Sequence, residues 1–165
     1  MRVYLPTTMA GLRELLDTGV HGHVPVTAFA VTPGLREWYV DDDIEELEYA
    51  AMMEAARASL RLLTEAYGSA RRRVVLAAEV PEDTVTVRDD VDRGVVHVAG
   101  PVPLTQVVAV HVDAAEAESA VAAAAKSIMA ADLGDPGAQD VVDDAEGFEL
   151  CWYAGQEIAA LLDLL

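Results

Sequence analysis

The stretch "REWYVDDDIEELEYAAMMEAARASLRLL" (Arg36–Leu63) carries the strongest structural pattern in the chain. Placed at 100° per residue, its apolar side chains form two neighbouring stripes that cover most of a helix. We therefore predict a long helix from about Asp43 to Tyr67, stopped near Gly68, with core packing on more than one side. The narrow polar stripe that remains contains Glu46, Glu54, Arg57 and Arg61. We expect surface ion pairs there, between Glu54 and Arg57 and around Arg61.

Two acids in this stretch, Glu45 and Glu48, point toward the apolar arc and not toward the polar stripe. As acids in the first turns, they are favoured by the helix dipole and can extend past the edge of the core. As a carboxylate pair three residues apart, they are also candidates for acid–base catalysis or metal binding. A third possibility is an ion pair with Arg72 or Arg73. The chain has no Glu-x-x-His, which weakens the metal hypothesis.

Strand-like and helix-like segments alternate on both sides of the long helix. This pattern predicts an α+β fold with a mixed sheet and helices packed on it. The halves 2–80 and 94–153 share a loose order of elements, which suggests a pseudo-duplicated β-α-β-α-β arrangement. Asp113 and Glu116 resemble a capping box that starts a further helix, whereas residues 132–147 are predicted to form a flexible acidic loop. The predicted strands cover 2–6, 26–32, 72–80, 84–88, 94–99, 107–113 and 148–153, and further helices cover 7–19, 113–131 and 155–165.

Length and charge restrict the class of protein. A chain of 165 residues is expected to form a single domain over 1–165. A net charge of −18 argues against binding to nucleic acid or to an anionic membrane surface. No apolar run is long enough to span a bilayer, and the first residues do not resemble a signal peptide, so we expect a cytoplasmic protein.

Aromatic residues precede the acidic run. Trp38 and Tyr39, together with Arg36, either form an exposed patch that binds a cationic or protein partner or cover one end of the core. The leucine-rich C-terminus, "LLDLL", suggests a homodimer surface or packing against the sheet.

The histidines and the single cysteine are weak candidates for chemistry. His21 and His23 lie two residues apart, so in an extended segment both can face one metal ion, although two ligands do not complete a zinc site. His97 and His111 fall in predicted strands and would be cross-strand neighbours if those strands pair. Cys151 lies in an apolar strand and is expected to be an inert core thiol. No cofactor-binding motif is present, so we expect no cofactor.

Several segments in this order resemble a family of small actinobacterial proteins of unknown function. The segments are "MRVYLP" at the start, "AVTPGLREWY" at 30–39, "EELEYAAMMEAARASLRLL" at 45–63, "RRRVVLAAEVP" at 71–81 and "GPVPLTQVVAVHVD" at 100–113. The resemblance covers nearly all of the chain except 132–147. It implies a bacterial, cytoplasmic protein and brings no activity, substrate or catalytic residue.

These observations leave two main hypotheses for function. The first is a small acidic domain that acts through contacts with a protein partner or as a homodimer. The second is an enzyme or small-ligand binder whose cleft lies around residues 36–48 and uses Glu45, Glu48, Arg36 and Tyr39. A metal protein built on His21 and His23 is a third.

Overall fold

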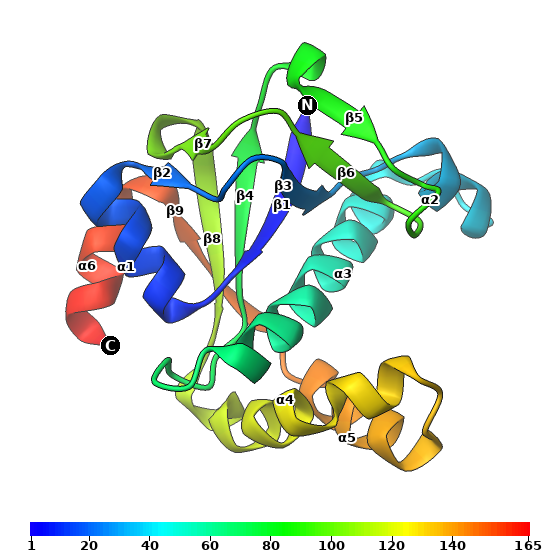
Figure 1. Ribbon diagram of the computed structural model, residues 1–165, viewed down its shortest axis with the longest axis vertical. Coiled ribbons are helices and arrows are strands. Elements are labelled where there is room, and N and C mark those ends of the chain that lie inside the picture. The colour runs from blue at the N-terminus through cyan, green and yellow to red at the C-terminus, as the bar shows by residue number, and fades with distance from the viewer.

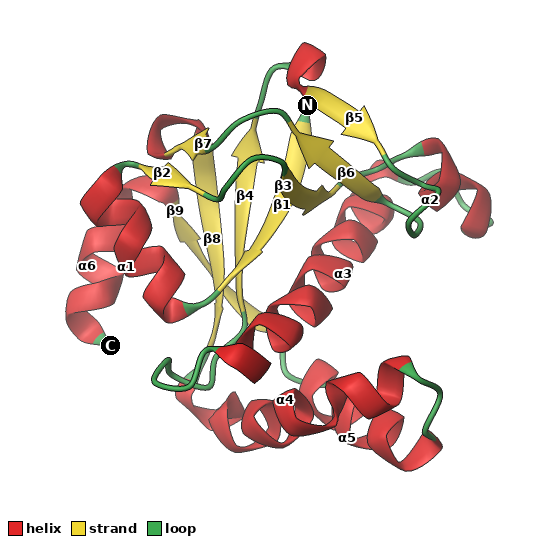
Figure 2. Ribbon diagram, viewed as in Figure 1, coloured by secondary structure: helices red, strands yellow, loops and turns green.

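The strand β1 (Arg2–Thr7) lies at the centre of a seven-stranded sheet in the order β5-β6-β3-β1-β4-β8-β9. The structure is a computed structural model that describes residues 1–165. Every pair of neighbouring strands is antiparallel, and a separate two-stranded sheet joins β2 and β7. Figure 2 shows this arrangement of strands and helices. The strands are β2 (Val20–His21), β3 (Val26–Phe29), β4 (Val74–Glu79), β5 (Val85–Val87), β6 (Val95–Val98), β7 (Val102–Pro103), β8 (Val107–Asp113) and β9 (Leu150–Ala154).

Helices cover both faces of this sheet, as Figure 1 shows. On one face, α1 (Met9–Thr18) and α6 (Ile158–Leu164) pack on the larger apolar core. On the other face, α3 (Ile44–Glu65) crosses β3, β1 and β4. The hairpin of α4 (Glu118–Asp132) and α5 (Pro136–Glu146) packs against the C-terminal half of α3, and the short α2 (Pro33–Trp38) precedes α3.

The α+β class with helices packed on a sheet is confirmed, but the sheet differs from the mixed one predicted. Its strands are connected so that all pairs are antiparallel. The strand order also shows no duplicated unit, because β6 pairs with β3 while β8 and β9 lie beyond β4 on the other side. Similar orders of elements along the chain therefore occupy different places in the sheet.

The predicted long helix is confirmed over Ile44–Glu65. Small side chains on its sheet-facing side, Ala51 and Ala55, are fully buried and let the helix approach the strands closely. Ser59, also buried, donates its hydroxyl to Thr7 O at 2.7 Å and accepts from Val74 N at 3.1 Å. The helix thus carries a polar group that joins the ends of β1 and β4.

The prediction of a flexible loop over 132–147 is wrong, because α5 occupies most of this segment. Asp135 accepts a hydrogen bond from Ala138 N at 3.1 Å, and Pro136 takes the first helical position. An N-cap acid followed by proline is a helix start as well as a turn signal. Val142 and Ala145 are fully buried against α3 and α4, so this acidic segment contributes to the core.

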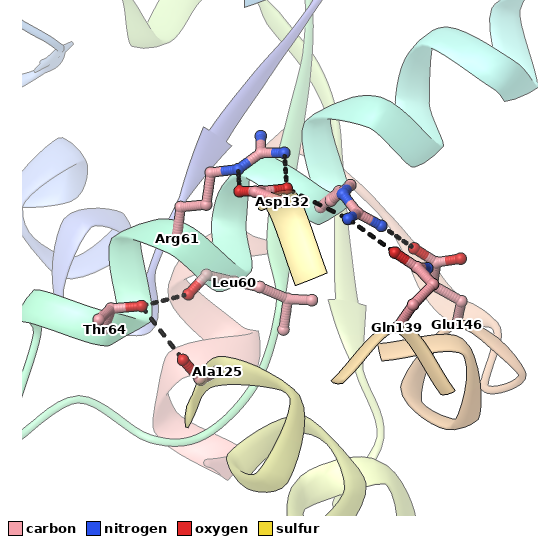
Figure 3. A network of polar contacts seen from close by, with 8 residues as sticks. Leu60, Arg61, Thr64, Ala125, Asp132, Gln139 and Glu146 are labelled. Atoms are coloured by element: carbon pink, nitrogen blue, oxygen red, sulfur yellow. Dashed lines mark hydrogen bonds and ion pairs between the residues drawn. The ribbon is translucent and has the colours of Figure 1, made fainter. Parts of the chain in front are cut away.

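The arginines of the polar stripe of α3 hold this hairpin in place (Figure 3). Arg61 forms two bonds with Asp132, at 2.7 and 3.0 Å. Arg57 donates to Asp132 at 3.1 Å and to Gln139 at 3.0 Å, and it lies 3.6 Å from Glu146. The surface pairs predicted within α3 are thus replaced by ion pairs between helices, which lower the pKa of the Asp132 carboxyl.

A buried ion pair joins β4 to β8. Asp113 accepts from Arg73 N, Nε and Nη2 at 2.7, 2.9 and 2.8 Å, and both side chains are fully buried. Arg73 Nη2 also donates to Phe148 O at 2.8 Å, just before β9. The predicted capping box at Asp113 is therefore wrong. The acid ends a strand, and α4 begins only at Glu118 after a short 3-10 turn.

We predict that Asp113→Ala strongly destabilises the fold. The change leaves the guanidinium of Arg73 buried without a counter-ion, which costs about 3–5 kcal/mol of the free energy of unfolding. Thermal and urea unfolding measure the loss. The double variant Arg73→Met/Asp113→Leu should recover most of it, since an apolar pair of similar volume leaves no charge buried. Equal losses in the single and double variants would contradict this account.

Candidate functional site

The segment between α2 and α3 shapes a cleft at the N-terminal half of α3. Thr32 caps α2 by accepting from Leu35 N at 3.2 Å, and α2 ends at Trp38, with Tyr39 as its C-cap. Asp43 then caps α3 by accepting from Glu45 N at 3.0 Å. The residues between Trp38 and Ile44 form the corner that joins α2 to α3.

The cleft beside this corner has a volume of about 660 Å³ and opens to solvent. Tyr39 and Tyr49 supply two partly exposed phenol rings, with 41% and 54% of their surface exposed. Four carboxylates line the cleft, and no Arg, Lys or His side chain does. The lining residues are Tyr39, Asp43, Glu45, Glu46, Tyr49, Ala50, Met53 and Glu54.

Glu54 is the deepest acid of the cleft. Burial raises the pKa of its carboxyl, and the nearby Asp92 raises it further. Arg57 and Arg61 act in the opposite direction but do not cancel the rise. The ionised form of Glu54 is therefore destabilised in the folded protein. A cation bound in the cleft would reduce this free-energy cost.

The whole chain can now be compared with known families. Residues 1–162 match the model of a family of unknown function. The chain belongs to the DUF6912 family. No curated protein and no solved structure matches the chain. The resemblance to an uncharacterised family is confirmed, and membership of DUF6912 brings no activity with it.

The aromatic patch of this DUF6912 chain is exposed and does not cover the core. Trp38 has 63% of its surface exposed, and the guanidinium of Arg93 lies over its ring, 3.6 Å from the centroid. Arg36 lies outside the cleft and is paired with Asp42. Of the three residues predicted to bind a partner, only Tyr39 lines the cleft.

Glu45 and Glu48 have different surroundings. Glu45 is exposed and lines the cleft. Glu48 is half-buried on the sheet side and accepts from the Tyr4 hydroxyl at 3.3 Å. Burial, and then the charge of Glu48, raises the pKa of Tyr4 to about 12. Neither glutamate pairs with the arginines expected from the sequence, because Arg73 binds Asp113 and Arg72 binds Glu118 at 2.8 Å.

The two histidines of the sheet, His97 and His111, lie on strands β6 and β8, which do not pair with each other. His97 lies opposite Thr27 and Thr86, whereas His111 lies opposite Val75 and Trp152, so the two are not cross-strand neighbours. Cys151 is partly exposed in β9.

His21 and His23 line two adjoining hollows beside α1. Burial lowers the pKa of His21. The structure contains no group of three or more His, Cys, Asp or Glu side chains placed to hold a metal ion. No helix is both long and apolar enough to cross a membrane.

Sequence reasoning missed Tyr49 and Glu54 as members of the cleft. At 100° per residue, Tyr49 falls on one of the apolar stripes of the helix and Glu54 on its polar stripe, and neither position by itself predicts a cleft. Tyr39, Glu45 and Tyr49 lie within eleven residues of one another in the sequence, and the one-turn spacing of Glu45, Tyr49 and Met53 was the available signal.

We predict that Glu54→Gln stabilises the free protein at pH 7. Because folding raises the pKa of this acid, the folded state binds the proton more tightly than the unfolded chain does. The stability of the folded state therefore falls as pH rises through the raised pKa. A neutral amide removes this cost, so the melting temperature at pH 7 should rise by roughly 1–2 °C.

The same measurement near pH 4 should show no such gain, because Glu54 is then protonated in the native protein. Glu37→Gln, at an exposed position of α2, is the control and should leave the melting temperature unchanged at both pH values. A lower melting temperature for Glu54→Gln at pH 7 would show that the carboxylate is stabilising.

Proposed function

We propose that this DUF6912 chain binds a basic segment of a protein partner in the cleft between the α2–α3 corner and α3. One observation carries the proposal. The cleft combines four carboxylates with two exposed tyrosine rings and no basic side chain. Carboxylates and aromatic faces together recognise guanidinium and ammonium groups.

The electrostatics of the cleft favour a positively charged occupant. The Glu54 carboxylate is destabilised by burial and by Asp92, and both penalties decrease when a cation lies nearby. An arginine already stacks on an aromatic ring next to the cleft, since Arg93 covers Trp38. A cation–π contact is thus already present within the chain, and the exposed rings of Tyr39 and Tyr49 can form the same contact with a cationic group of a partner.

A protein segment suits the cleft better than a free small cation does. The corner exposes Val40 completely and nearly half of the surface of Ile44. A partner of protein size can cover these apolar groups together with the tyrosines, whereas a small polyamine would leave them in water. The net charge of −18 further accelerates the approach of a basic partner.

The sequence composition supports two further parts of this proposal. Ten of the eleven basic residues are arginine, with Lys126 as the exception, and this bias is typical of GC-rich actinobacterial genomes. We propose an actinobacterial origin and a location in the cytoplasm. The same negative charge supports a role that involves neither nucleic acid nor a membrane surface.

A peptide titration tests the binding proposal. The probe is a fluorescein-labelled decapeptide of alternating arginine and glycine, and the comparison peptide has glutamine in place of arginine. We expect saturable binding of the arginine peptide, weakened when the salt concentration rises from about 50 to about 300 mM. Spermidine should compete only weakly.

A matched pair of variants separates the cleft from the overall charge. Glu45→Gln/Glu46→Gln/Tyr49→Ala should weaken binding by about tenfold, roughly 1.4 kcal/mol. Glu82→Gln/Glu116→Gln/Tyr67→Ala removes the same charge and one tyrosine from exposed positions elsewhere, and it should change binding by less than about twofold. Equal losses in the two variants would overturn the assignment of the site. Tighter binding of spermidine than of the peptide would overturn the assignment of the partner.

A further inference from the structure

The last strand of the sheet, β9, has an unpaired edge. It pairs with β8 on one side and has no neighbour on the other. Its sequence, "LCWYA" (Leu150–Ala154), contains no Asp, Glu, Lys, Arg or Pro. Exposed edge strands are usually protected by charge, proline, a bulge or very short length. Within its five residues β9 has none of these devices, and the nearest charges are Glu149, which directly precedes the strand, and Glu157, whose carboxylate accepts from Ala154 N at the C-terminal end of the strand.

The hydrogen-bond pattern shows which backbone groups of β9 are free. Asp113 donates its N–H to Arg73 O at 3.1 Å, so the backbone N–H and C=O groups of Asp113 point toward β4. Along an antiparallel ladder the direction alternates, so Val110 and Val112 direct their backbone groups toward β9. Their partners there are Tyr153 and Cys151.

The backbone groups of the alternate residues, Leu150, Trp152 and Ala154, therefore point away from the sheet. One of them is covered, because Glu157 accepts from Ala154 N at 3.0 Å. The N–H and C=O groups of Trp152, at the middle of the strand, remain without a protein partner at this edge.

The side chain of Trp152 adds an exposed aromatic group to this unprotected edge. It has 61% of its surface exposed and lies opposite His111, on the same face of the sheet as α3. Phe148, just before the strand, is also partly exposed. At the other end of the sheet, β5 has only three residues and is followed directly by Arg88, Asp89 and Asp90, so that edge is protected by length and charge.

We propose that β9 pairs antiparallel with β9 of a second copy of this chain, around a two-fold axis at Trp152. This register places Trp152 opposite its own copy, where each N–H donates to the C=O of the other. It places Leu150 opposite Ala154, where Leu150 N–H donates to Ala154 C=O while Ala154 N–H keeps its bond to Glu157. A strand edge that is self-complementary about its central residue forms the isologous contact of a two-fold dimer.

If two copies associate, this edge is a place where the charge repulsion between them is small. Two chains of net charge −18 repel each other over most of their surfaces. The segment Leu150–Ala154 has no acidic side chain, so pairing here places no carboxylate of one strand directly opposite a carboxylate of the other. The two tryptophans become a cross-strand aromatic pair, which adds to the stability of the ladder.

The dimer would join two seven-stranded sheets into one. A two-fold axis perpendicular to the sheet leaves α3 of both copies on the same face. His111 and Trp152 from both copies then form the floor of that face between the two α3 helices.

Sedimentation equilibrium of the full chain tests the proposal. We expect a monomer–dimer equilibrium with a Kd on the order of 10 µM, as is typical of a small interface. Trp152→Lys should raise this Kd at least tenfold, because it removes the aromatic pair and places two like charges at the axis. Trp152→Tyr retains an aromatic pair and should remain dimeric.

The other tryptophan of the chain provides a matched control. Trp38 is exposed to nearly the same extent, 63% against 61%, but it lies at the end of α2, on the opposite side of the molecule from β9 (Figure 1). Trp38→Lys should leave the dimer unchanged. A native chain that stays monomeric up to about 1 mM would overturn the proposal, as would a dimer that survives Trp152→Lys with its affinity intact.

Amide hydrogen exchange gives a second readout that is specific to the backbone. The amide of Trp152 should exchange more slowly as the protein concentration rises, while that of Cys151, bonded to β8, should be protected at every concentration. Exchange of Trp152 that does not depend on concentration in a dimeric sample would place the interface elsewhere and overturn the proposal.

Discussion

The buried pair of Arg73 and Asp113 fixes the relation between the last three strands of the sheet. Asp113 accepts three hydrogen bonds from Arg73, one of them from its backbone. The same guanidinium reaches Phe148 O, at the point where the chain enters β9. A shift of β8 along β4 would break these hydrogen bonds and leave both charges buried without a partner, which is strongly destabilising. The pair thereby sets the alternation that leaves the backbone groups of Trp152 at the free edge.

The helix α3 connects the sheet to the α4–α5 hairpin. Its small residues lie flat on β1 and β4, and Ser59 joins the ends of both strands. Its arginines hold the α4–α5 hairpin through Asp132, Gln139 and Glu146. What remains of its surface is the acidic N-terminal half, which becomes one wall of the cleft. The excess of negative charge in the cleft thus results partly from the use of these arginines elsewhere.

The long helix was predictable from the sequence because its apolar spacing repeats over six turns and needs no knowledge of its partners. The orientation of Glu48 was predictable for the same reason, and it does face inward. Its partner was not, since Tyr4 lies 44 residues away in the sequence and meets Glu48 only because α3 packs over β1. The helix α5 was missed because Asp-Pro-Gly is a turn signal and a helix start alike, and its burial depends on contact with α3 and α4.

For the candidate site, the sequence by itself determined that aromatic and acidic residues gather around Tyr39 and Glu45, since these residues are close neighbours along the chain. It also determined a net charge of −18, which restricts the kind of partner. Only the tertiary structure decided that Tyr49 and Glu54 join this cleft, that Arg36 lies outside it, and that β9 lies at an edge of the sheet. The physical reason is that periodicity and charge are local properties of a chain, whereas strand order, ion-pair partners and exposed edges depend on contacts between residues far apart in the sequence.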